Sequence, residues 1–98
     1  MAESEDIMKV KNKFTERVYE TIQYSYENYE KCKTFITEKM DISIHPIMPD
    51  MTCYGLKSYE DITRIKPSDY IIRTITDGLP LYNNVTEEIM KSNFEITK

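Results

Sequence analysis

An acid, a hydroxyl and the one histidine of the chain stand at alternate positions, at Asp41, Ser43 and His45. Residues two apart lie on the same face of a β-strand, so a strand here would present the three side chains together. A hydroxyl and an imidazole are groups of nucleophilic catalysis, and an acid with a histidine is a pair of metal ligands. The same residues also suit the solvent face of a half-buried strand.

Distance favours the solvent face over catalysis. Same-face residues of one strand stand roughly 7 Å apart at the backbone, whereas a nucleophile and its base must approach to about 3 Å. No further metal ligand follows at a suitable spacing. We therefore expect Asp41, Ser43 and His45 to face a binding partner from an edge strand. We expect no catalytic residue, no metal and no cofactor.

The chain has eight tyrosines and no tryptophan. Tyrosine brings a large contact area, one hydrogen-bonding group and little rotamer entropy, which suits protein interfaces. Tyr26 and Tyr29 belong to a stripe of helical spacing and are expected in a core. Tyr19 and Tyr24 fall off that stripe, and we add them to the predicted binding residues.

The elements that must position these residues begin with a segment free of proline and glycine, residues 6–38. Its apolar and aromatic residues recur every three or four positions, which predicts one long amphipathic helix. The stripe consists of Phe14, Val18, Ile22, Tyr26, Tyr29, Cys32 and Ile36. Residues 1–6, before this helix, are expected to be disordered.

After the helix the apolar period changes to two at Met40, which predicts a strand that ends at Pro46 and Pro49. Pro46 has no N–H to donate, which favours an edge position. The signal over residues 51–59 is weak and fits a short second strand or a loop. A short helical piece could follow at 59–63.

The triplet Pro67-Ser68-Asp69 predicts the start of a second helix, and Asp77-Gly78 its end. A short strand, "LPLYNN", follows, and Thr86 is expected to cap a short last helix. The tail "NFEITK" is a short strand or a frayed end. This order predicts one α+β domain over residues 1–98, an α/β two-layer arrangement. In it the long helix packs on a small sheet, with the small α/β part at 40–98.

Composition narrows the function classes. The 98 residues carry 17 acidic and 13 basic side chains, a net charge of −4, which gives no basic face for nucleic acid. No window is apolar enough for a membrane span, and the acidic N-terminus is no signal peptide, so we expect a cytoplasmic protein. Cys32 and Cys53 have no metal-site spacing and are expected to be buried free thiols.

The segment from about residue 34 to 83, with "MDISIHPIMPD" and "SDYIIRTITDGLPLYNN", resembles the C-terminal half of a minimal nucleotidyltransferase domain of the DNA-polymerase-β type. In that family a strand with an aspartate follows a helix, and Asp41 matches the third family carboxylate. The family also has a Gly-Ser turn and an Asp-x-Asp strand, and this sequence has neither. The resemblance therefore implies a half-domain that binds a nucleotide or completes an enzyme in trans.

These observations lead to two alternative functions. The first is a small acidic, non-catalytic protein-interaction module that binds a larger protein partner and forms a homodimer. Phage- or virus-encoded inhibitors of a host defence or replication machine share this profile, and such a protein would work in the host cytoplasm. The second is the degenerate nucleotidyltransferase half-domain. A membrane or nucleic-acid partner is not expected in either case.

Overall fold

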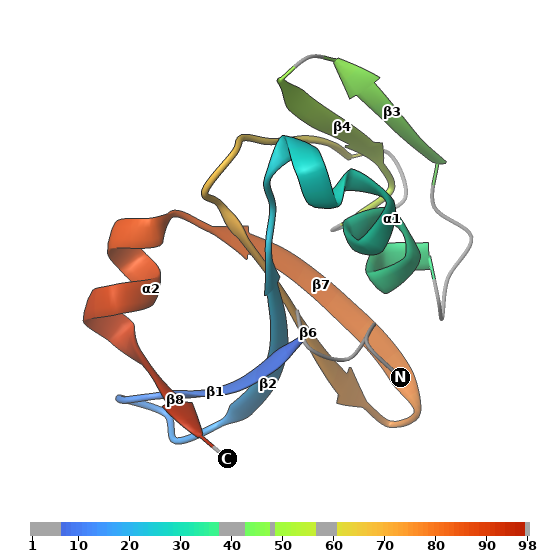
Figure 1. The fold of residues 1–98 in the computed structure, drawn as a ribbon. Coiled ribbons are helices and arrows are strands. Elements are labelled where there is room, and N and C mark those ends of the chain that lie inside the picture. Colours follow the sequence, from blue (N-terminus) through green and yellow to red (C-terminus); the bar gives the residue numbers. More distant parts are fainter. Residues whose placement is uncertain (1–6, 38–42, 48, 57–60, 98) are drawn as a thin grey trace.

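The computed structural model describes residues 7–37, 43–47, 49–56 and 61–97. These residues form two antiparallel sheets and two α-helices (Figure 1). The strands are β1 Met8–Asn12, β2 Val18–Gln23, β3 Ser43–Ile47, β4 Asp50–Tyr54, β5 Ile62–Ile65, β6 Tyr70–Thr76, β7 Leu79–Val85 and β8 Phe94–Thr97. The helices are α1 Tyr29–Thr37, which follows a 3₁₀ turn at Tyr26–Asn28, and α2 Glu87–Asn93.

The larger sheet has five strands in the order β7-β6-β2-β1-β8, and the smaller sheet has the order β3-β4-β5. Neighbouring strands pair antiparallel in both. Because β8 returns to pair with β1, the terminal strands of the larger sheet are β7 and β8. Figure 1 shows that this sheet is strongly twisted, with α2 on one side and α1 with the smaller sheet on the other.

Each face of the larger sheet is covered by its own hydrophobic cluster. On one face, α1 and the smaller sheet pack against the strands, and the buried residues include Ile22, Phe35, Met51, Ile65 and Ile71. On the other face, α2 and β8 enclose Val10, Ile72, Met90 and Phe94. The neighbours Ile71 and Ile72 belong to different clusters because successive strand residues point to opposite faces.

Arg73 of β6 fixes α1 to the larger sheet. Its buried side chain pairs with Glu20 of β2, with 2.6 Å between Nη2 and Oε1. Nη1 donates a hydrogen bond of 3.0 Å to the carbonyl of Phe35 in the last turn of α1. The guanidinium carbon also lies 4.2 Å from the centre of the Phe35 ring. A cation at a helix C-terminus interacts favourably with the helix dipole, so Arg73 stabilises the C-terminal end of α1 against the larger sheet.

The predicted long helix over residues 6–38 is wrong. Most of its first half forms the β1–β2 hairpin, and α1 begins only at Tyr29. Three members of the predicted buried stripe are exposed: Phe14 at 76%, Tyr26 at 55% and Val18 at 51%. The fold-class prediction is corrected accordingly. The described residues form mainly antiparallel sheet with two short helices, and no long helix packs on a small sheet.

The turn of this hairpin explains part of the error. The side-chain Oδ1 of Asn12 accepts hydrogen bonds from the backbone N–H groups of Phe14 and Thr15, at 2.8 and 2.9 Å. Glu16 takes a left-handed φ of 64°, and its N–H donates back to the Asn12 carbonyl at 2.8 Å. A side chain that caps its own turn competes with helix formation, and the β-branched residues that follow favour a strand.

The predicted second helix, from Pro67 to Asp77-Gly78, is also wrong. That segment forms a turn and then β6. Asp77 and Gly78 have φ values of 54° and 80°, and positive φ at both central residues is the geometry of a type I′ hairpin turn. The pair joins β6 to β7, which includes the predicted strand "LPLYNN". A dipeptide that commonly ends a helix therefore closes a hairpin here.

Several local predictions are confirmed. The strand predicted from Met40 is present as β3, although residues 38–42 lie outside the described residues. It does not end at Pro46, as predicted, because Pro46 pairs with Met51 and the strand continues to Ile47. The weak segment at 51–59 contains most of β4, and the tail forms β8. Thr86 caps α2, because its Oγ1 accepts a hydrogen bond of 3.2 Å from the N–H of Ile89.

Two further predictions concern the whole chain. Residues 1–6, predicted to be disordered, lie outside the described residues, and the single domain over 1–98 stays a prediction. Neither described helix has the length and the apolar character that crossing a membrane would require.

Candidate functional site

An apolar cavity of about 350 Å³ lies between α2, β1 and β8. Its walls are formed by Met8, Val10, Tyr70, Met90, Lys91, Phe94, Glu95 and Ile96. Val10, Met90 and Phe94 are buried at its base, whereas the side chain of Ile96 is 68% exposed. Ile96 stands opposite Val10 in the ladder between β8 and β1, which places it at the cavity rim.

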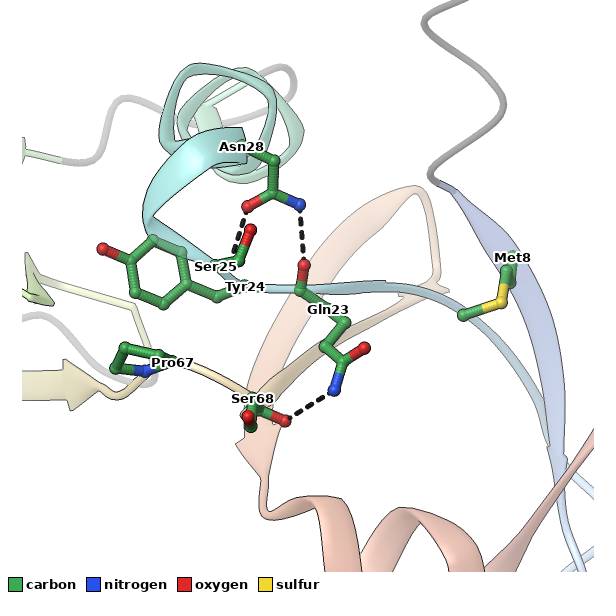
Figure 2. A pocket seen from close by; sticks show the side chains of 7 residues that line it. All are labelled: Met8, Gln23, Tyr24, Ser25, Asn28, Pro67 and Ser68. Atoms are coloured by element: carbon green, nitrogen blue, oxygen red, sulfur yellow. Dashed lines mark hydrogen bonds between the residues drawn. The ribbon is translucent and has the colours of Figure 1, made fainter.

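A second cavity, of about 420 Å³, shares Met8 with the first as a lining residue. Figure 2 shows the residues that line it: Met8, Gln23, Tyr24, Ser25, Asn28, Pro67 and Ser68. They come from β1, the end of β2, the 3₁₀ turn and the turn before β6. Unlike the first cavity, this one, the polar cavity, combines neutral amide and hydroxyl groups with the apolar side chains of Met8 and Pro67, and none of the residues named here is charged.

Internal hydrogen bonds hold the polar cavity in shape. The side-chain Nδ2 of Asn28 donates a hydrogen bond of 2.7 Å to the carbonyl of Gln23, and its Oδ1 accepts one of 2.8 Å from the N–H of Ser25. The side-chain amide of Gln23 in turn donates a hydrogen bond of 3.1 Å to the carbonyl of Ser68, as a dashed line in Figure 2 shows. Ser68 adopts a φ of 83°, a conformation that is costly for a residue other than glycine. The hydrogen bonds offset this cost, and the neutral donors and acceptors suit a polar, uncharged segment of a ligand.

Charges near the apolar cavity are arranged in pairs. Lys91 lies 3.7 Å from Glu87 one turn earlier in α2, and Lys11 lies 3.4 Å from Glu95 across β1 and β8. Burial, and next the negative charge of Glu87, raise the pKa of Tyr70. The phenol therefore remains neutral at physiological pH, and the cavity presents apolar surface with little net charge.

The predicted binding residues Tyr19 and Tyr24 lie on opposite faces of the larger sheet. Tyr19 is half-buried and packs edge-on against Phe94, with 5.8 Å between ring centres, so it supports the wall of the apolar cavity. Tyr24 lies in the core under α1 and is 1% exposed, and its hydroxyl donates a hydrogen bond of 2.7 Å to the carbonyl of Pro49. Tyr24 also lines the polar cavity, but its ring packs mainly against the core residues.

The structure places Ser43 and His45 on β3, a terminal strand of the smaller sheet, as the edge-strand prediction requires. Ser43 stands opposite Tyr54 and His45 opposite Thr52 in the ladder with β4. Asp41 lies outside the described residues. β3 belongs to the smaller sheet, whereas the apolar cavity is formed by α2 with β1 and β8 of the larger sheet, so the structure does not gather the predicted binding residues into one site.

The described residues contain few groups that could perform covalent chemistry. Cys32 and Cys53 are both fully buried thiols that form no disulfide, which confirms that prediction. Burial raises the pKa of Cys53 to about 12, so its thiol stays protonated and unreactive at neutral pH. Among the described residues, no three His, Cys, Asp or Glu side chains are grouped to hold a metal ion.

Sequence reasoning missed the residues that form the apolar cavity. A signal for them exists, because Met8 and Val10 alternate with lysines, and Phe94 and Ile96 alternate with polar residues. This period of two is typical of half-buried strands. This signal is not recognised because Met8 and Val10 lie in the segment predicted to be a helix, and Phe94 and Ile96 lie in a tail that fits a strand or a frayed end.

Comparison of the chain with protein-family models, curated proteins and solved structures finds no match. The geometry of the two cavities and of the neighbouring β8 edge therefore carries the functional argument. The resemblance of residues 34–83 to a nucleotidyltransferase half-domain stays a prediction, since Asp41, its matching carboxylate, is outside the described residues.

Proposed function

We propose that this protein is a non-catalytic interaction module that binds an extended segment of a larger partner protein along β8. One observation carries the proposal. An apolar cavity opens on one face of β8, and β8 is a terminal strand of its sheet. Main-chain groups at such an edge can pair with an added strand, while the cavity takes alternate side chains of that strand.

The neighbouring polar cavity extends the same binding path. Because Met8 lines both cavities, a segment that fills the apolar cavity continues into a region of neutral amides and hydroxyls. That change of character fits a partner segment with an apolar anchor followed by polar, uncharged residues.

The size of the edge favours a separate partner over a second copy at this strand. β8 has four residues, so its edge is about 13 Å long. Stable protein pairs bury roughly 1,200–2,000 Å² in total, and two four-residue strands paired edge to edge fall well short of that. A partner segment that also fills the cavities adds the side-chain contacts that the short edge lacks.

The test is a selection of peptides from a random displayed library against the intact protein, followed by affinity measurements with two variants. Ile96→Glu places a carboxylate at the rim of the apolar cavity, where binding would have to strip it of water. We expect selected peptides to show alternating apolar residues and to lose at least about tenfold in affinity for this variant.

Ile62→Glu is the matched control, because Ile62 is 62% exposed on the smaller sheet, away from β8. Its effect on affinity should stay within about twofold. Equal losses for both variants would contradict the proposal, and so would a selection that yields no binder. The identity of the partner, as a component of a host defence or replication machine, remains the prediction made from composition.

A further inference from the structure

Three residues, one from each strand, stand in line across the smaller sheet. Thr52 of β4 stands between His45 of β3 and Arg64 of β5 in the two ladders. The neighbours of Thr52 in β4, Met51 and Cys53, are fully buried in the cluster under α1. Thr52 must therefore point to the opposite, outer face.

The hydroxyl of Thr52 lacks a partner in the described part of the chain. The residue is 5% exposed, and its Oγ1 is buried without a hydrogen bond. Leaving a buried hydroxyl unpaired costs free energy, and nearly all buried polar groups in native proteins are paired. The Thr52 hydroxyl can therefore form a hydrogen bond that the isolated protein does not use.

Opposite Thr52 in the ladder, Arg64 of β5 has a loosely held guanidinium. Its side chain is 59% exposed, and its Nε lies 3.7 Å from Oδ2 of Asp50, beyond hydrogen-bond distance. A surface ion pair of this geometry contributes little to stability. Arg64 can therefore exchange the Asp50 carboxylate for another one at small cost, and a planar guanidinium binds a carboxylate best through two hydrogen bonds.

We propose that the outer face of the smaller sheet binds an acidic side chain of a partner protein, with the carboxylate held by Arg64 and Thr52. Arg64 supplies the complementary charge, and the Thr52 hydroxyl donates one hydrogen bond. Because Oγ1 is covered in the isolated protein, binding requires side chains on this face of the sheet to move so that the carboxylate reaches the hydroxyl.

The adjoining row of the sheet supplies an apolar border. Tyr54 and Ile62 are cross-strand neighbours there and are 45% and 62% exposed. They can cover the apolar part of the acidic side chain and its neighbours. This surface is separate from the apolar cavity beside β8, so neither site requires the other.

The test is an NMR titration of the isotope-labelled intact protein with sodium glutarate, at an ionic strength held constant with sodium chloride. We expect saturable shifts at the amides of Thr52 and Arg64 and at the Arg64 Nε–H. Arg64→Gln should weaken glutarate binding at least about tenfold, and Thr52→Val about threefold or more. Thr52→Ser keeps the hydroxyl and should bind as the unchanged protein does.

Arg17→Gln is the control for charge, because it removes one exposed positive charge from the β1–β2 turn and leaves the smaller sheet untouched. It should not alter glutarate binding. Shifts that fail to saturate, or that persist in Arg64→Gln, would overturn the proposal. A parallel titration with sodium phosphate separates the two anion classes, and tighter binding of phosphate would also overturn the assignment to a protein carboxylate.

Discussion

At the scale of single residues, burial decides what the polar and reactive side chains can do. Cys53 is a potential nucleophile in the sequence, yet it lies fully buried in the cluster under α1. Burial raises its pKa from 9.0 to about 12, because the thiolate would lose its hydration. The same burial turns Tyr24 from a predicted contact residue into part of the core. Arg73 avoids this penalty through its pairing with Glu20.

The raised pKa of Cys53 makes stability dependent on pH in the alkaline range. The unfolded chain loses this proton near pH 9.0, whereas the folded chain keeps it until about pH 12. The contribution of Cys53 to the free energy of unfolding is therefore constant below pH 9.0 and falls as pH rises toward 12, by up to about 1.4 kcal/mol per pH unit. Urea unfolding at several alkaline pH values measures this slope.

Cys53→Ala should show a shallower alkaline slope than the unchanged protein, although its stability at neutral pH is lower because of the lost core volume. A residual slope remains from Tyr24, whose pKa is also raised by burial. Identical slopes for the two proteins would show that the thiol does not titrate in the way that its burial requires.

At the scale of elements, caps and turns decide where helices and strands begin. Thr86 ends β7 and begins α2, and it does so with a single side-chain hydrogen bond to the N–H of Ile89. Glu87 and Glu88 in the first turn add a favourable interaction with the helix dipole. Because Met90 and Lys91 of α2 line the apolar cavity, this cap also positions the proposed binding groove.

Thr86→Ala should lower the free energy of unfolding by about 1 kcal/mol, because it leaves an N-terminal N–H of α2 without its side-chain partner. Chemical denaturation followed by circular dichroism measures the change. Thr86→Ser, which keeps the oxygen acceptor, is the matched variant and should lose only a few tenths of that amount. If the alanine and serine variants were equally stable, the hydroxyl would not act as a cap in solution.

At the scale of the whole molecule, both terminal strands of the larger sheet carry exposed apolar residues. Besides Ile96 on β8, Leu79 and Leu81 on β7 are 66% and 55% exposed. β7 has seven residues against the four of β8, so it offers a longer edge to a second copy. The homodimer predicted from the sequence therefore fits β7 better than β8, which stays available to the proposed partner.

We expect a solution mass of about twice 11.7 kDa by light scattering coupled to size exclusion, over a hundredfold range of concentration. Leu81→Lys should shift the protein toward the monomer, because a charge on an exposed edge strand opposes pairing with another strand. Ile62→Lys, on the smaller sheet, should leave the mass unchanged. A mass of 11.7 kDa at every concentration would contradict the homodimer prediction.

What the sequence determined by itself is local. The cap at Thr86, the strand "LPLYNN", the strand at 43–47 and the burial of two small thiols all follow from residue type and short-range pattern. The cap and the two strands depend on interactions within a few residues, which a pattern of that length contains. The burial of the thiols follows instead from the general tendency of cysteine to lie in a core.

The tertiary structure decided the choice between helix and strand in the first part of the chain. β2 pairs with β1 on one side and with β6 on the other, where Ile22 stands opposite Ile71 and Glu20 opposite Arg73. These partners lie far along the chain, so no window around β2 records them. Residues with helical spacing became a strand because pairing and burial against distant strands outweigh a weak local propensity. The apolar cavity beside β8 also depends on a contact between distant segments, since it exists only when the last strand pairs with the first.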